Sequence, residues 1–177
     1  MIYSRRVVLA GMACGIVLTL LGGLDGEAGP KGERGDRGKG PQGRGLSAEA
    51  RDTIHHLFSS HRSIARKVEV TDTGYRATTT SSDPEIEALL RTHLKQMKAR
   101  LESGRAVRRW DPAFDEMMEH YADMRVHVRN VPGGVTVEVV GKTPEAIRVA
   151  RNHAKVVSSF VKNGPAEAGK EHPRVVF

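Results

Sequence analysis

The chain has 177 residues with a formal net charge of +7, and 5% of its residues are aromatic. Without its two unusual ends, it is the size of a single domain. Its one cysteine, Cys14, lies in an apolar N-terminal run, which excludes a disulfide or a cysteine-based metal site in the folded region. Lysine and arginine are scattered among aspartate and glutamate without interleaved aromatic residues, which argues against a nucleic-acid-binding protein.

The first residues have the pattern of an export signal. In the stretch "SRRVVLAG", four residues resemble those of a bacterial twin-arginine signal: Ser4, Arg5, Arg6 and Leu9. The apolar run from Val7 to Leu24 is roughly 27 Å long as a helix, which is marginal for crossing a bilayer. We expect residues 1–25 to be a signal peptide or an N-terminal membrane anchor of a periplasmic or cell-surface protein. The alternative to the twin-arginine route is an ordinary secretory signal that contains two arginines.

Residues 26–45 are a glycine-rich linker. Glycine recurs at every third position from Gly23 to Gly38, and the repeat then changes phase. This pattern resembles collagen-like sequence, in which only glycine fits the axis of a triple helix. The resemblance implies a trimeric stalk. The run is short and its phase breaks, which favours the alternative of a solvated, flexible spacer, since a charged, glycine-rich segment cannot bury a core.

Residues 46–104 have the periodicity of one α-β-β-α unit. Ser47 can cap a helix through "SAEARDTIHHLFSSHRSIA". The alternation in "KVEVTDTGYRATTT" predicts a hairpin with its turn at "DTG". Asp83 can cap a second helix with Pro84 at its first position, and Gly104 ends that helix.

Residues 105–163 repeat this order. Asp111 and Pro112 start a helix through "AFDEMMEHYADM", and "RVHVRNVPGGVTVEVV" alternates as a second hairpin. Thr143 and Pro144 open the last helix. Its segment "RNHAKVV" matches "RTHLKQM" sixty residues earlier, with a histidine at the third position of each.

A repeated unit that cannot bury its own apolar face pairs with its copy. The sequence therefore predicts an α+β fold of two αββα repeats with pseudo-twofold symmetry, spanning residues 46–104 and 105–163. The expected sheet has four antiparallel strands, with the helices on one face. Residues 164–177 are polar until their end, and we expect this tail to be disordered.

With "WDP" between its two copies, the region from Leu46 to Asn163 resembles small exported bacterial domains of uncharacterised activity. That resemblance transfers no catalytic residue. The linker around "WDP" is the most basic stretch of the folded region, and we expect a solvated connector with a docked Trp110.

Four histidines lie on or beside the apolar faces of the predicted helices: His61, His93, His120 and His153. Twofold pairing would bring them to the interface between the two repeats. Neutral imidazole is a common ligand of zinc, copper and haem iron, so all four are candidate metal ligands. His93, His153 and Met97 are also candidate haem ligands. No Cys-x-x-Cys-His motif is present, so a haem would be held non-covalently.

The alternative for each histidine is a hydrogen-bonded core residue, and duplication copies such a residue without any function. Four further histidines are expected to be exposed: His55, His56, His127 and His172. No catalytic residue is predicted, because Ser59, Ser60 and Ser63 lack a nucleophile elbow.

The sequence therefore favours an exported, non-catalytic domain that binds haem or a transition metal such as copper or zinc. Electron transfer, metal sensing or metal buffering would be its role. The alternative is a cofactor-free structural or interaction module on a collagen-like stalk at the cell surface. The expected partners are the membrane, through the N-terminal segment, and further copies of the chain, but not nucleic acid.

Overall fold

The computed structural model describes residues 45–176, so the predicted export signal and nearly all of the glycine-rich linker lie outside it. The larger elements follow in chain order: α1 (Ala48–Ser59), β1 (Ala65–Thr71), β2 (Gly74–Thr80), α2 (Pro84–Glu102), α3 (Pro112–Glu119), β3 (Met124–Val131), β4 (Gly134–Gly141) and α4 (Pro144–Asn163). Three short 3-10 helices complete the set: η1 (His61–Ser63), η2 (Tyr121–Asp123) and η3 (Gly164–Ala166).

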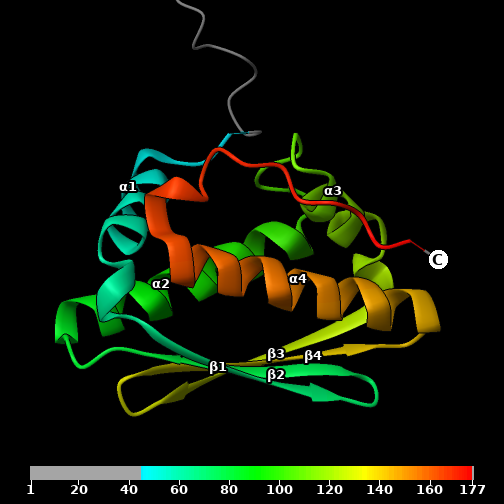
Figure 1. Cartoon of the computed structure of the whole chain (residues 1–177), viewed down its shortest axis with the longest axis horizontal. Helices are drawn as coiled ribbons and strands as arrows, with labels where there is room; N and C mark the ends of the chain where they lie inside the picture. Colours follow the sequence, from blue (N-terminus) through cyan, green and yellow to red (C-terminus); the bar gives the residue numbers. More distant parts are fainter. Residues whose placement is uncertain (1–44, 177) are drawn as a thin grey trace, which may run out of the picture. The chain divides into compact units, whose positions relative to one another are not determined.

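The four strands form one antiparallel sheet in the order β1-β2-β4-β3. Strands β1 and β2 form one hairpin, β3 and β4 form the other, and β2 pairs with β4 at the centre. Figure 1 shows the helices on one side of this sheet, with the other side left open. The α+β class and the four-stranded antiparallel sheet predicted from the sequence are confirmed.

The strand register separates an apolar inner face from a polar outer face, because residues directly opposite one another share a face. One inner row crosses all four strands: Val68, Ala77, Val137 and Val128. The adjacent outer row is polar: Lys67, Thr78, Thr136 and Arg129. His127 also lies on the outer face, exposed as predicted.

The helices begin where their capping residues predict. The side chain of Asp83 accepts from the backbone N–H of Glu85, and Thr143 caps α4 in the same way. The predicted first helix is too long, however, because α1 ends at Ser59 and η1 follows it. The hydroxyl of Ser59 donates to the carbonyl of His55, a local bond that competes with helix continuation.

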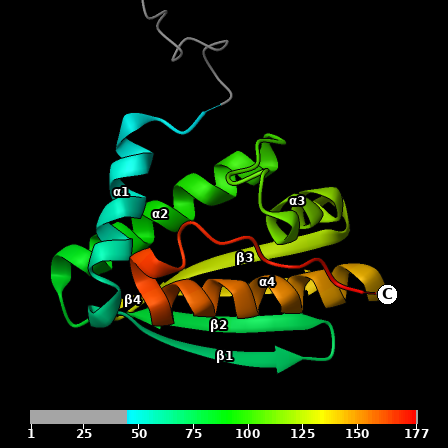
Figure 2. The same ribbon diagram turned by 45° about the horizontal axis from the view of Figure 1, so that its top comes forward.

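Helix α4 lies along the sheet and contributes most of the helical core. Small residues, Ala146, Ala150 and Ala154, line its buried face and let its backbone approach strands β2 and β4 closely. Figure 2 shows α4 running alongside β2 and β1. Among the described helices, none is long and apolar enough to cross a membrane.

Arginines tie each long helix to a hairpin turn. Arg91 of α2 donates to the carbonyls of Val131, at 3.1 Å, and Gly134, at 3.5 Å, in the β3–β4 turn. Arg151 of α4 donates to the carbonyls of Thr71, Asp72 and Gly74 in the β1–β2 turn. Each long helix is therefore bound to the turn of the hairpin that is not immediately before it in the chain.

The passage from β4 into α4 requires glycine at position 141. A Cβ atom on Gly141 would lie 2.5 Å from the backbone nitrogen of Ile147. We expect Gly141→Ala to lower the unfolding free energy by about 1–3 kcal/mol, since the helix must shift to relieve this overlap. Urea denaturation measures the loss. Gly169→Ala is the matched control, because no atom lies within 4 Å of its added Cβ, and an equal loss there would contradict the explanation.

Candidate functional site

The structure places the four candidate histidines on different elements. His93 lies in α2 and His153 in α4, whereas His61 begins η1 and His120 follows the end of α3. Among residues 45–176, no group of three or more His, Cys, Asp or Glu side chains is placed to hold a metal ion. The four histidines therefore do not form one cluster.

His93 and His153 nevertheless share an unusual property. The Nδ1 atom of each ring is buried without a hydrogen-bond partner in the described region. The pKa of each ring is lowered to about 4, mainly by burial; for His153 the charge of Arg66 contributes to the lowering and that of Asp111 opposes it. The ring of His153 packs edge-on against Phe114, with centroids 5.2 Å apart. Both histidines are therefore neutral at physiological pH.

An open hollow lies between η1, β1 and the C-terminal part of α4, with a volume of about 570 Å³. We call it the basic hollow, and its lining is His61, Arg62, Ile64, Arg66, Ser158, Val161, Lys162 and Asn163. Three of these side chains carry permanent positive charge and none is acidic. The hollow therefore has a positive potential that favours an anion.

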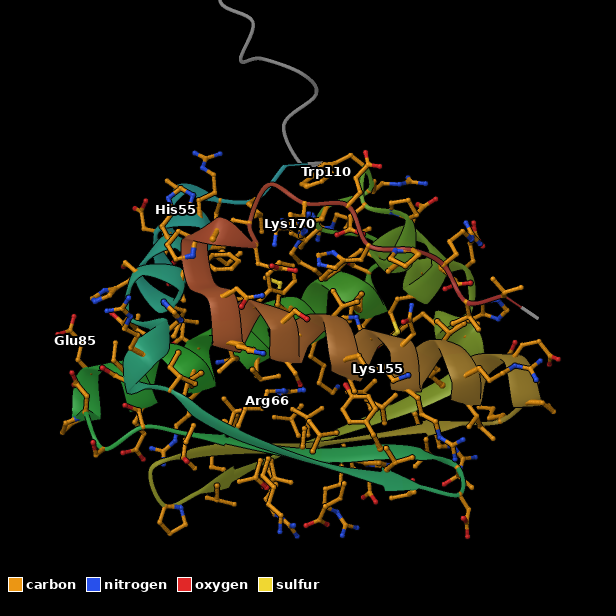
Figure 3. All side chains as sticks on the ribbon, viewed as in Figure 1. His55, Arg66, Glu85, Trp110, Lys155 and Lys170 are labelled. Carbon is orange, nitrogen blue, oxygen red and sulfur yellow. The ribbon has the colours of Figure 1, made fainter. Side chains whose placement is uncertain are left out.

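Arg66 is the most enclosed cation of the basic hollow. Its Nη1 donates to the hydroxyl of Thr79 at 2.8 Å, and its Nε donates to the hydroxyl of Ser158 at 3.3 Å. Burial lowers the pKa of Arg66, and the hydroxyl of Tyr75 partly offsets this effect. Figure 3 shows the side chain between the sheet and α4. Within residues 45–176, no acidic side chain pairs with this guanidinium.

His61 is held against the end of α4. Its Nδ1 lies 3.1 Å from the carbonyl of Val161, and because a carbonyl only accepts, Nδ1 carries the proton and donates. Gly164 has a φ of 56°, and a Cβ there would lie 2.2 Å from the Cδ2 atom of His61. Only glycine leaves room for the ring, so η3 fixes one wall of the basic hollow.

A second polar cluster binds the C-terminal segment. Asp111 is fully buried and accepts from both the backbone N–H and the Nδ1 of His172, at 3.0 and 2.8 Å. The Nε2 of His172 lies 3.1 Å from a carboxylate oxygen of Glu167. Burial alone would raise the pKa of Asp111, but the bonds from His172 and Arg108 outweigh it and lower that pKa. Hydrogen bonds from Lys170, Asn163 and His172 lower the pKa of Glu167 to about 2.

The tail that the sequence predicts to be disordered therefore packs on α3 and α4 through residue 175. Arg108 donates to the carbonyls of Ala168 and Lys170 while stacking on the half-exposed Trp110, at 4.2 Å. Buried Glu116 accepts from the backbone N–H of Val175. The exposure expected for His172 was wrong, because the ring is buried between Glu167, five residues earlier, and Asp111, sixty-one residues earlier. His55 and His56 are exposed as expected.

The residues of the basic hollow, other than His61, were not predicted as a site. One signal was present: Arg66 alternates with Val68 and Val70 in "ARKVEV", which places a charged side chain on the inner face of a strand. No protein-family model matches the chain, and the curated proteins and solved structures compared with it give no match either.

The neutral histidines predict how stability depends on pH. Below pH 6.5 the unfolded chain binds protons at His93 and His153 that the native protein does not bind until about pH 4. The unfolding free energy should fall over this window by up to about 1.4 kcal/mol per pH unit for each histidine. Denaturant unfolding between pH 6.5 and pH 5 measures the slope. His93→Gln and His153→Gln should each reduce it, whereas the exposed His55→Gln should not, and equal slopes in all variants would contradict the assignment.

Proposed function

We propose that this domain is an exported, non-catalytic module that binds an anion in the basic hollow. One observation carries the proposal: Arg66 is largely enclosed, yet its hydrogen-bond partners Thr79 and Ser158 and the neighbouring Tyr75 offer only uncharged hydroxyl groups. The export signal and membrane tether remain part of the proposal and rest on the resemblance of residues 1–25 to such signals.

Electrostatics favours an anion at this position. Enclosing a charge costs several kcal/mol unless an opposite charge or strong hydrogen bonds offset the loss of hydration. Hydroxyl groups offset part of this cost for Arg66, but they bring no negative charge. Arg62 and Lys162 add further positive potential at the rim of the same hollow. A bound anion would lower the energy of all three cations together.

The hydrogen bonds of the lining favour binding over catalysis. The hydroxyl of Ser158 donates to the carbonyl of Ala154 at 2.8 Å and accepts from Arg66. Its proton is therefore engaged by a backbone oxygen rather than by a general base, and this serine is not activated as a nucleophile.

We also propose that the domain consists of two copies of one αββα unit related by an approximate twofold axis. Ala77 and Val137 are sixty residues apart and lie directly opposite each other in the β2–β4 pairing. A twofold axis between them would exchange each copy for the other. The matching bonds of Arg91 and Arg151 to opposite hairpin turns support this symmetry.

The proposed symmetry gives the basic hollow a counterpart with different chemistry. Sixty residues away, Val126 replaces Arg66, Lys98 replaces Ser158 and Glu102 replaces Lys162. Lys98 and Glu102 form an ion pair with each other. In the counterpart, the positive charge of Lys98 is therefore offset by Glu102, so an anion would bind to only one of the two copies.

Arg66→Met should abolish anion binding and raise the unfolding free energy of the ligand-free protein, because it removes an enclosed charge that no carboxylate offsets. Calorimetric titration of the full chain with inorganic phosphate at low ionic strength measures the binding, and urea denaturation in phosphate-free buffer measures the stability. Arg129→Met, on the exposed outer face of β3, removes an equal charge and should leave binding unchanged. Failure of the unaltered protein to bind phosphate saturably, or equal binding by both variants, would refute the proposal.

A second candidate function is the binding of haem or a transition metal through His93 and His153, with Met97 one turn after His93. The unpartnered Nδ1 atoms of both histidines favour it, since a neutral imidazole nitrogen that lacks a hydrogen bond is a ready metal ligand. His61 and His120 would have to act elsewhere, because the described residues do not gather them into the same cluster. Electron transfer, metal sensing or metal buffering would then be the role.

Protein purified after passage through its own export route tests this second function. We expect a Soret band, or one equivalent of copper or zinc by elemental analysis, that His93→Gln and His153→Gln each remove and the exposed His55→Gln retains. Protein with neither a Soret band nor stoichiometric metal would exclude this candidate.

A further inference from the structure

The size, charge and lining of the basic hollow specify the kind of anion that it would take. We infer that the ligand is an organic phosphomonoester, whose phosphate group binds at Arg66 and whose organic part lies over Ile64 and Val161. This inference rests on the proposed anion-binding function and names the class of its ligand.

The hollow is larger than an inorganic anion requires. Its volume is about 570 Å³, whereas a water molecule occupies roughly 30 Å³ in the liquid and a phosphate group takes the space of only a few waters. Pockets that bind small organic ligands have volumes of roughly 300–1,000 Å³. A phosphate group would therefore fill one end and leave most of the space to the remainder of the ligand.

The charges of the lining match a phosphomonoester better than a carboxylate. Arg62, Arg66 and Lys162 supply three positive charges, and no acidic side chain lines the hollow. A phosphomonoester carries between about −1.5 and −2 charges at neutral pH, whereas a carboxylate carries one. The dianion would therefore gain more from this field than a monocarboxylate.

Arg66 also retains the donors that a phosphate needs. A guanidinium has five N–H groups, of which the bonds to Thr79 and Ser158 use two. Three N–H groups remain, with the hydroxyl of Tyr75 nearby, and a pair of donors on one guanidinium is the arrangement that binds two phosphate oxygens at once. The bonds to Thr79 and Ser158 hold the guanidinium in one orientation before any ligand arrives.

The remaining lining suits an organic group of mixed polarity. Ile64 and Val161 contribute apolar side chains, and Asn163 contributes an amide. Because Nδ1 of His61 donates to the carbonyl of Val161, Nε2 is the nitrogen left to accept a hydrogen bond. Such a wall contacts an apolar part of a ligand and satisfies a hydroxyl group beside it.

Comparative calorimetry on the full chain tests this inference. We expect glycerol 3-phosphate or adenosine 5′-monophosphate to bind about tenfold or more tightly than inorganic phosphate, because only the esters contact Ile64 and Val161. Val161→Thr should remove this advantage while leaving the affinity for inorganic phosphate unchanged. Val157→Thr, one turn earlier on α4 and outside the hollow, is the matched control and should preserve it.

A lipid headgroup could present the same chemistry, so the second arm uses phosphatidylcholine vesicles with and without phosphatidic acid. Co-sedimentation that requires phosphatidic acid and Arg66, together with weak binding of the soluble esters, assigns the phosphomonoester to a lipid. Tight binding of the soluble esters alone assigns it to a free metabolite. Both results support a phosphomonoester.

The failures of the two proposals are distinguishable. If inorganic phosphate binds through Arg66 but neither the soluble esters nor the phosphatidic acid vesicles bind more tightly, the anion site stands and the phosphomonoester inference is overturned. If no phosphate compound binds saturably, both proposals fall.

Discussion

The pairing of β2 with β4 is the interaction on which the rest of the structure depends. It joins two hairpins into one sheet and places both turns within reach of the long helices. Because Arg151 bonds to the β1–β2 turn, α4 is tied to the hairpin that precedes α2 while it also packs on its own strand β4. That position sets the C-terminal part of α4 beside η1 and β1, and the basic hollow forms between them.

The buried carboxylates and the enclosed guanidinium of Arg66 differ in the groups that offset their charge. Asp111 and Glu116 are almost completely buried, and each accepts hydrogen bonds from the C-terminal segment. Glu167 is bonded by Lys170, Asn163 and His172. These buried acids are thus balanced by donors within the chain, whereas Arg66 is balanced only by hydroxyl groups. This contrast is the reason to assign a ligand to Arg66 and a stabilising role to the cluster around His172.

Local patterns were sufficient to predict most of the fold. Capping residues such as Asp83 and Thr143 mark helix starts because their side chains satisfy free N–H groups of the first turn. Alternation identified both hairpins because one face of the sheet is apolar. The length predicted for the first helix was too great, because its apolar spacing continues past Ser59, whose hydroxyl bonds to the backbone at the end of α1.

The candidate site was less accessible to sequence reasoning because its parts meet only in three dimensions. Arg66 and Ser158 are 92 residues apart, and nothing in the local sequence connects them. The tail was misjudged for the same reason: its polar composition predicts disorder, but partners such as Asp111 and Glu116 lie about sixty residues earlier. The one local indication of the hollow was the position of Arg66, which its strand alternation places on the inner face of the sheet.

The bonds between the α3 region and the C-terminal segment also determine when the domain can finish folding during its synthesis. Asp111 leaves the ribosome 61 residues before its partner His172. Glu116 likewise emerges 59 residues before its partner Val175. During that interval Asp111 has only the donors of Arg108 and Ala113, and Glu116 lacks the backbone N–H of Val175, so the full burial of both acids must wait for the C-terminal segment. The sheet and long helices are free to assemble during translation, but the domain closes only after its last segment has emerged. Any process that requires the fully closed domain can therefore act only after residue 175 has emerged.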